Sequence, residues 1–417
     1  MKRRDFFRFM TAGTVTAGTF LYSPLWSFRL KQAQAATGKT LIVIFQRGGC
    51  DGLNCVVPFA DPEYYNLRPT IAIPHPDSGD PRSALPLNNF FGLHPSLSPL
   101  LEIFQAGDLA VMPTVHYPNG SRSHFDSEII IESGARDKLF DGWLNRHLSH
   151  STPTGNPHLR AVGFGNEIPH SLRGEAPVSI FNDISDFSFT SDSAANDFRN
   201  RLRQVYEQPV NPDDCNRKIL QEQGLILFDN LDFLETLQPD DYEPENGVEY
   251  PRSSYGRQLM QTAMLIKQGV GLETATLDLG GWDTHSNQGG AQSGGYQARR
   301  LLEFAAGIKA LYSDLDGLMN DVVILTMTEF GRTARENGSG GTDHGNAATW
   351  FAIGHPINSG IYGAWPGLKP ENLYKERYLA HTIDFRDVLA EIAGLHLNNP
   401  YLETIFPDHS YKPIGFL

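Results

Sequence analysis

Several short, continuously apolar runs constrain the fold of this chain more than any other feature of its sequence. The runs are TLIVIF (40–45), LAVMPTV (109–115), PVSIF (177–181), TATLDL (274–279), DVVILTM (321–327) and TWFAIG (349–354). Their length and their β-branched residues predict buried strands. Because apolar and polar residues do not alternate, both faces of these strands must be covered, which is typical of a parallel sheet between two layers of helices.

Helical patterns lie between several of these runs. One begins at Pro95 and stops at Gly107, and another, residues 296–319, gathers leucines and alanines on one face. The alternation predicts an α/β fold with a largely parallel central sheet and helices on both faces, formed by residues 36–417 as one domain. Residues 185–250 are polar and acidic. We expect them to form a helical insertion that caps the sheet.

The first 35 residues differ from the rest of the chain. Paired Arg3 and Arg4 precede a weakly apolar run, and the small residues AQA stand at 33–35. This pattern is typical of a twin-arginine signal peptide cleaved after Ala35. We therefore expect the twin-arginine translocase as a partner and a periplasmic or secreted, folded protein. The alternative is an uncleaved anchor, but glycines and threonines dilute the run, so we expect no stable membrane span after cleavage.

Charge and cysteine usage narrow the function. A formal net charge of -14 argues against a nucleic-acid partner, since phosphate backbones are bound by basic patches. The cysteines are Cys50, Cys55 and Cys215. A bridge between Cys50 and Cys55 stays open, and the absence of paired CxxC spacing argues against a cysteine-based metal site.

Polar, ionisable residues follow four of the predicted strands at the point where each strand ends. They are Arg47 and Asp51; Ser121, Arg122, Ser123 and His124; Asp283 and His285; and Glu329 and Arg332. In an open α/β sheet, ligands bind at the carboxyl ends of the strands. The sequence therefore predicts one shared site at this edge.

The residue types at this edge favour a metal centre. Imidazole nitrogens and carboxylate oxygens bind divalent cations, and the motifs GGWDTH and GTDHG each place an Asp near a His. Of the adjacent pair Asp343 and His344, one is expected to ligate and the other to support it. Each motif alone is typical of an ordinary turn. Together they predict a centre for zinc, one or two ions, with Mn, Ca or Mg left open; the candidate ligands are Asp51, Asp283, His285, Glu329, Asp343 and His344.

Arginines and serines on the same loops point to an oxyanion substrate. The guanidinium groups of Arg122 and Arg332 suit phosphate or sulfate oxygens. Ser121 or Ser123 is a candidate nucleophile, and its ordinary alternative is the N-cap of the helix that follows. A metal-free Ser-His-Asp hydrolase competes with this hypothesis, but the chain contains no G-x-S-x-G motif.

Motifs along the whole chain after the signal resemble those of an exported family catalogued as domain of unknown function 1501, within the alkaline phosphatase superfamily. The motifs are RGGCDGLN, DPEYYNLRP, GLHPSLSPL, SRSHFDS, GWLNR, GGWDTH, TMTEFGR, GTDHG and TIDFRDVLAEIAG. The resemblance implies an alkaline phosphatase-like fold with metals bound by Asp and His. It also implies that Asp51 matches the first aspartate of the superfamily, the serines at 121–123 its nucleophile, and Asp283 with His285 a ligand pair.

Two registers are open beyond His285. Either GTDHG is the Asp-His pair of the superfamily, or TEFGR takes its place and His344 is the later histidine. We favour the second register, in which Phe330 stands where the relatives have a ligand histidine. The resemblance implies a metal-dependent hydrolase of small or polymeric phosphate or sulfate esters; the alternative is a non-catalytic cell-envelope binding protein with at most a structural metal.

Overall fold

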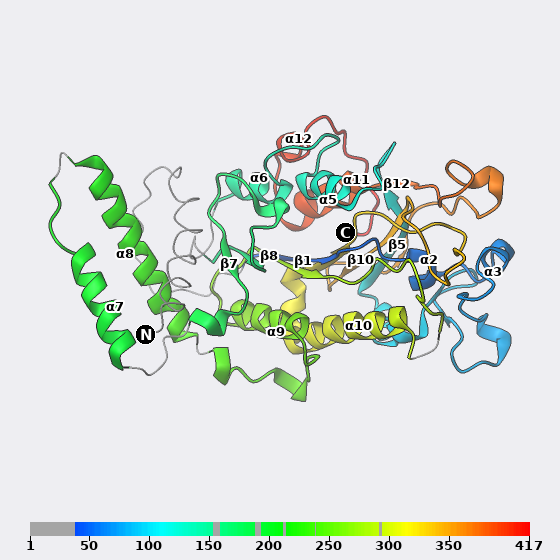
Figure 1. Ribbon diagram of the computed structural model, residues 1–417, viewed down its shortest axis with the longest axis horizontal. Helices are drawn as coiled ribbons and strands as arrows, with labels where there is room; N and C mark the ends of the chain where they lie inside the picture. The colour runs from blue at the N-terminus through cyan, green and yellow to red at the C-terminus, as the bar shows by residue number, and fades with distance from the viewer. Residues whose placement is uncertain (1–37, 153–158, 188–192, 212–213, 238, 292–293) are drawn as a thin grey trace.

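The computed structural model describes residues 38–152, 159–187, 193–211, 214–237, 239–291 and 294–417. The predicted signal, residues 1–35, lies outside these residues. The chain forms an α/β fold around a mostly parallel central sheet, as predicted (Figure 1).

The sheet of the described residues has nine strands. They are β1 (Thr40–Gln46), β5 (Leu109–His116), β6 (Ala161–Phe164), β7 (Ser179–Phe181), β8 (Thr274–Leu279), β9 (Val322–Met327), β10 (Ala348–Ile353), β11 (Gly360–Ile361) and β12 (Ile383–Asp384). Their order is β11-β5-β10-β9-β1-β8-β6-β7, and β12 also pairs with β5. Only β10 runs antiparallel to its neighbours here, β5 and β9. The remaining described pairs in this sheet are parallel.

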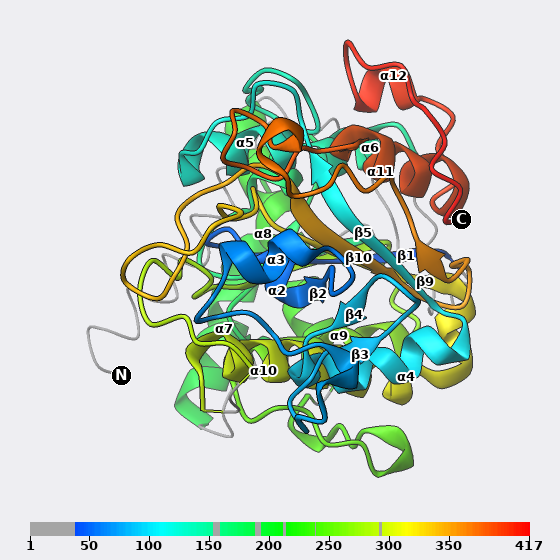
Figure 2. The same cartoon turned by 90° about the vertical axis from the view of Figure 1, so that its right-hand side faces the viewer.

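Helices cover both faces of the sheet, as the uninterrupted apolar strands require. On one face lie α5 (His124–Ser133), α6 (Trp143–Ser149), α11 (Phe385–Glu391) and α12 (Leu402–Ile405), and on the other α4 (Ser98–Ala106), α9 (Ser254–Lys267) and α10 (Tyr296–Leu315) (Figures 1 and 2). Alternate residues of β1 enter two separate cores. Ile42 and Ile44 pack on the α4, α9 and α10 side, whereas Leu41 and Val43 pack on the other side.

Smaller elements flank the carboxyl edge of the sheet. Helices α2 (Gly52–Cys55) and α3 (Pro62–Leu67) follow β1, and a small sheet contains β2 (Val56–Val57), β4 (Gly92–Leu93) and β3 (Leu85–Pro86). Cys50 and Cys55 are free and buried, with their sulfur atoms 3.4 Å apart. The bridge that the sequence left open is therefore not formed in this structure.

The insertion at 185–250 is helical, as predicted, and its residues Leu234 and Leu237 pack into the core on one side of the sheet. Its helices α7 (Ser193–Tyr206) and α8 (Cys215–Thr236) form a hairpin that projects beyond the β7 edge (Figure 1). Among the described residues, none of the helices combines the length and apolarity that a bilayer crossing requires.

Candidate metal centre

Loops from different parts of the chain meet at the carboxyl edge of the sheet. The loop after β1 provides Gly48 and Gly49, the loop after β5 leads into α5 at His124, and the loop after β8 carries Asp283 and His285. The connection between β9 and β10 carries Glu329, Arg332, Asp343 and His344. Since β10 runs antiparallel, the residues before it lie at the same edge as those after β9.

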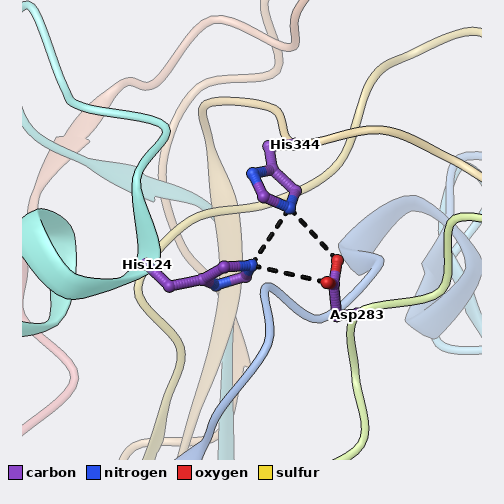
Figure 3. Close-up of side chains that lie close together, drawn as sticks. All are labelled: His124, Asp283 and His344. Carbon is purple, nitrogen blue, oxygen red and sulfur yellow. Dashed lines mark hydrogen bonds and ion pairs between the residues drawn. The ribbon is translucent and has the colours of Figure 1, made fainter.

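His124, Asp283 and His344 converge on one point (Figure 3). His344 Nε2 lies 3.0 Å from His124 Nε2 and 3.1 Å from Asp283 Oδ1. His285 adds a fourth ligand atom, because its Nε2 lies 3.0 Å from His344 Nε2 and 3.0 Å from Asp283 Oδ1. His124 Nε2 lies 3.7 Å from Asp283 Oδ2. Atoms bound to one tetrahedral zinc ion at about 2.0 Å lie about 3.3 Å from each other, so distances of 3.0 to 3.7 Å suit a single cation.

The other ring nitrogen of each imidazole faces an oxygen. His124 Nδ1 lies 2.6 Å from Glu329 Oε1, His285 Nδ1 lies 3.1 Å from Asp343 Oδ1, and His344 Nδ1 lies 2.8 Å from the Arg122 carbonyl oxygen. An Nδ1–H that donates to these oxygens leaves the lone pair on Nε2, which is the form in which imidazole binds metals. The donor set therefore fits a divalent cation of the zinc type.

Electrostatics favour the ionised form of Asp283. Burial works against its charge, but the hydrogen bond and charge of Arg332 outweigh burial, with help from His285 and His344, so the pKa of Asp283 lies below its ordinary value. The hydrogen bond to Glu329 is the main reason why the pKa of His124 lies above the ordinary imidazole value. A cation bound here displaces that proton.

The centre is open to solvent on one side. The side chains of Asp283 and His285 are 46% and 47% exposed, whereas those of His124 and His344 are 26% and 23% exposed. Structural zinc sites are closed by their ligands, and catalytic sites keep a position for water or substrate. Four protein ligands fill a tetrahedral shell, so a substrate oxygen that enters from the exposed side would bind as a fifth ligand or replace His285.

Asp51 was predicted as a ligand, but the structure gives it another role. Its carboxylate accepts hydrogen bonds from both terminal nitrogens of the buried Arg68, at 2.6 and 2.9 Å, and from Gln288 at 2.6 Å. Asp51 is 1% exposed and belongs to neither of the metal-capable groups among the described residues. A carboxylate neutralised in this way anchors the loop after β1.

Arg332 was predicted to clamp an oxyanion, and in the structure its guanidinium contacts the protein. Its side chain is fully buried, and its guanidinium donates to the carbonyl oxygens of Gly49 and Gly48 at 2.6 and 3.0 Å and to Asp283 Oδ1 at 2.6 Å. Arg332 therefore orients Asp283 and joins it to the loop after β1.

Glu329 and Asp343 support histidines and do not point at the centre. Besides His124, Glu329 accepts the Gly48 N–H at 2.9 Å. Glu329 also forms a second metal-capable group with His124 and Glu128, but there the Arg47 guanidinium lies 3.3 Å from Glu128 Oε2, so the protein itself supplies positive charge. Of the pair in GTDHG, His344 faces the centre and Asp343 supports His285.

The two candidate serines differ in how far their hydroxyls are used. Ser121 Oγ accepts the Ser123 N–H at 3.1 Å. Ser123 is the N-cap residue of α5, but its side chain makes no capping hydrogen bond. The Ser123 hydroxyl, half-buried and directly before His124, has no partner among the described residues. Arg122 is exposed and stacks on Tyr378, with its guanidinium carbon 5.0 Å from the ring centroid.

His124 is the candidate ligand that the sequence did not predict. The sequence places it in the loop after β5 beside the serines, which was the available signal, but a single histidine at a helix start has no partner nearby in the chain. Phe330, at the position of the ligand histidine in the favoured register, packs its buried ring 4.9 Å from both His124 and His344. Gly49 (φ +68) leaves room for this ring, since an added Cβ would lie 2.5 Å from it.

Comparisons with known proteins give a family match and distant structural likenesses. A family model described as "Protein of unknown function (DUF1501)" matches residues 38–399. A search of curated proteins finds no match. The solved structures that resemble the chain include Ps i-CgsB in complex with k-i-k-neocarrahexaose (TM-score 0.39, 10% identity, covering 89% of this chain and 75% of that one).

Two further solved structures are similar at the same level. They are the PsFucS1 sulfatase from Pseudoalteromonas sp. (TM-score 0.35, 9% identity, covering 95% of this chain and 74% of that one) and the lipoteichoic acid synthase LtaP from Listeria monocytogenes (TM-score 0.32, 9% identity, covering 93% and 78%). Likenesses this distant do not bear on the function of the chain.

Proposed function

Since the chain belongs to the DUF1501 family of proteins of unknown function, we propose a function from its centre: a metal-dependent hydrolase of phosphate or sulfate esters. The observation that carries this proposal is the convergence of three imidazole Nε2 atoms on the Asp283 carboxylate, at 3.0 Å for His285, 3.1 Å for His344 and 3.7 Å for His124. His124, Asp283, His285 and His344 would hold the cation. A cation there acts as a Lewis acid towards the ester oxygens.

The residues around the centre support this chemistry. Ser123 is the better candidate nucleophile, because its hydroxyl is not used by the protein and it stands at the N-terminus of α5, where backbone N–H groups favour an anion. Ser121 stays the second candidate. Arg122 is the arginine that can meet an anionic substrate, since it is exposed, whereas Arg332 is fully buried.

Export is part of the proposal. The paired arginines and the AQA site at 33–35 support passage through the twin-arginine translocase and a periplasmic or secreted location. That route carries folded proteins, which suits a centre built from distant segments.

The test combines metal content with turnover. Purified full-length protein is analysed for bound metals and assayed on aryl phosphates and aryl sulfates, beside Asp283→Ala and the control His355→Ala, a partly exposed histidine outside the centre. We expect about one zinc per chain and turnover of one ester class in the wild type and the control, and loss of both in Asp283→Ala. Bound metal without turnover of either ester would reject the hydrolase and favour the binding protein.

A further inference from the structure

Two arginines gather around one aromatic ring beside the centre. The guanidinium carbons of Arg122 and Arg377 lie 5.0 and 5.6 Å from the centroid of Tyr378. Tyr378 is 7% exposed and is fixed by backbone bridges to Thr333 and Tyr374. Guanidinium groups are attracted to the face of an aromatic ring, so this buried ring helps to hold both guanidinium groups in place.

Both arginines are joined to the supports of the ligand histidines. The carbonyl oxygen of Arg122 faces His344 Nδ1 at 2.8 Å. The Arg377 guanidinium lies 3.1 Å from Asp343 Oδ2, and Asp343 Oδ1 faces His285 Nδ1 at 3.1 Å. The backbone of Arg122 and the guanidinium of Arg377 therefore border the centre on the side of His285 and His344.

Of the two arginines beside the centre, one has a carboxylate partner among the described residues and the other has none. Arg377 is 56% exposed and has a carboxylate partner in Asp343, so orienting Asp343 accounts for its position. Arg122 is exposed and makes no ion pair with any described residue. Unpaired positive charge at the rim of a site is informative in a chain with a formal net charge of -14, because it attracts anions against the overall field.

We propose that Arg122 and Arg377 form a second anion subsite beside the centre, for an additional sulfate or phosphate group of a substrate that carries several. This inference rests on the proposed function and narrows its substrate class to polyanionic esters. The reacting group occupies the centre, and the planar guanidinium groups receive the oxygens of a neighbouring group through charge-assisted hydrogen bonds.

The test measures binding without turnover. Zinc-loaded, full-length protein is titrated calorimetrically with alkane disulfonates and alkane diphosphonates of two to six carbons, and with the matching monosulfonates and monophosphonates. We expect the best-fitting dianionic probe to bind about tenfold more tightly than its single-group counterpart, which is the effect of one charge-assisted contact. The two series show whether the subsite prefers sulfate-like or phosphate-like groups.

Variants decide whether the arginines cause this preference. Arg122→Ala and Arg377→Ala are expected to reduce it severalfold, whereas the control Arg82→Ala, which removes an exposed arginine paired with Asp80, keeps it. Arg122→Ala is decisive if Arg377→Ala loses zinc, because it leaves the backbone contact to His344 intact. Equal binding of one-group and two-group probes, or a preference that survives Arg122→Ala, overturns the subsite.

The subsite and the hydrolase fail separately. If the protein prefers two-group probes but cleaves no ester, the subsite is supported and the hydrolase is rejected. If the protein cleaves simple aryl esters but binds one-group and two-group probes equally well, the hydrolase is supported and the subsite is rejected.

Discussion

Each ligand histidine of the centre depends on the oxygen that faces its outer nitrogen. Glu329, Asp343 and the carbonyl of Arg122 hold the three Nδ1 atoms, so they decide which nitrogen carries the lone pair. The strongest of these supports is Glu329, since its carboxylate is fully buried and lies 2.6 Å from His124.

Glu329→Gln is expected to weaken metal binding. The amide keeps the shape of the side chain but lacks the negative charge that orients and polarises His124, and loss of such a support costs about 10- to 100-fold in metal affinity. Competition with a chromophoric chelator measures the affinity, and Glu336→Gln, at a carboxylate that accepts from Thr70, is the matched control. An unchanged affinity in Glu329→Gln would show that Glu329 does not support the centre.

Metal affinity is expected to rise with pH through the raised pKa of His124. Below that pKa a proton occupies the imidazole, and above it the lone pair is free to bind the cation. Because the hydrogen bond to Glu329 is the main cause of the raised pKa, Glu329→Gln should move this rise to lower pH. Chelator competition between about pH 5.5 and 8 tests this; an identical pH dependence in both proteins contradicts it.

At the scale of residues, the sequence predicted the centre in part. Asp283, His285 and His344 lie together because each follows or precedes a strand at the edge where ligands bind. Asp51 lies at the same edge, but its carboxylate is paired with the buried Arg68. Arg68 directly follows α3, and the sequence does not predict this pair. The role of Asp51 as a ligand stays a prediction. The roles of Ser121 and Ser123 stay predictions.

At the scale of elements, one buried carboxylate ties three segments together. Glu273, directly before β8, lies 2.6 Å from His147 Nε2 on α6 and 2.5 Å from Arg160 Nε, just before β6. Burial disfavours its charge, but the hydrogen bonds of His147 and Arg160 outweigh burial and lower its pKa to about 2. The charge of Glu273 therefore stabilises the join between α6 and the sheet.

Glu273→Gln is expected to lower the free energy of unfolding by about 2–4 kcal/mol at neutral pH, because it leaves the buried Arg160 guanidinium without its carboxylate partner. A carboxyl with a depressed pKa contributes stability above its unfolded pKa of about 4.5, and this contribution is lost as pH falls towards about 2. The difference in unfolding free energy between Glu273→Gln and the wild type should therefore shrink as pH falls through that range. Urea unfolding at several pH values measures it, with Glu102→Gln as the exposed control; a constant difference contradicts the assignment.

The apolar runs predicted the strands well, because burial on both faces leaves a strong signal. The strand 274–279 matches β8 residue for residue. The helical character of the insertion was predicted, but the placement of its hairpin was not, because a polar helix pair can project into solvent as readily as it can cover a sheet, and composition does not distinguish the two. Strand β6 was missed because its four residues, AVGF, include a glycine.

At the scale of the whole molecule, the centre connects the loops of several strands, so a bound cation stabilises the folded state alone. Zinc at 100 times its dissociation constant is expected to stabilise the fold by about 2.7 kcal/mol and raise the Tm. Removal with a chelator reverses the shift. Differential scanning calorimetry measures the Tm with and without zinc, and the Tm of His344→Ala should not depend on zinc. An equal rise in Tm in His344→Ala would show that zinc stabilises the fold from another site.

The interleaved strand order has a practical consequence. Strand β8 lies between β1 and β6, and β10 lies between β5 and β9, so the segments before and after the α7–α8 hairpin alternate across one sheet. A chain divided at the tip of that hairpin yields two fragments, of which one carries His124 and the other Asp283, His285 and His344. Neither fragment contains all the strands of the sheet. Zinc binding would therefore indicate that the two fragments have reassembled, and the hairpin is a suitable place to divide the protein for fragment complementation.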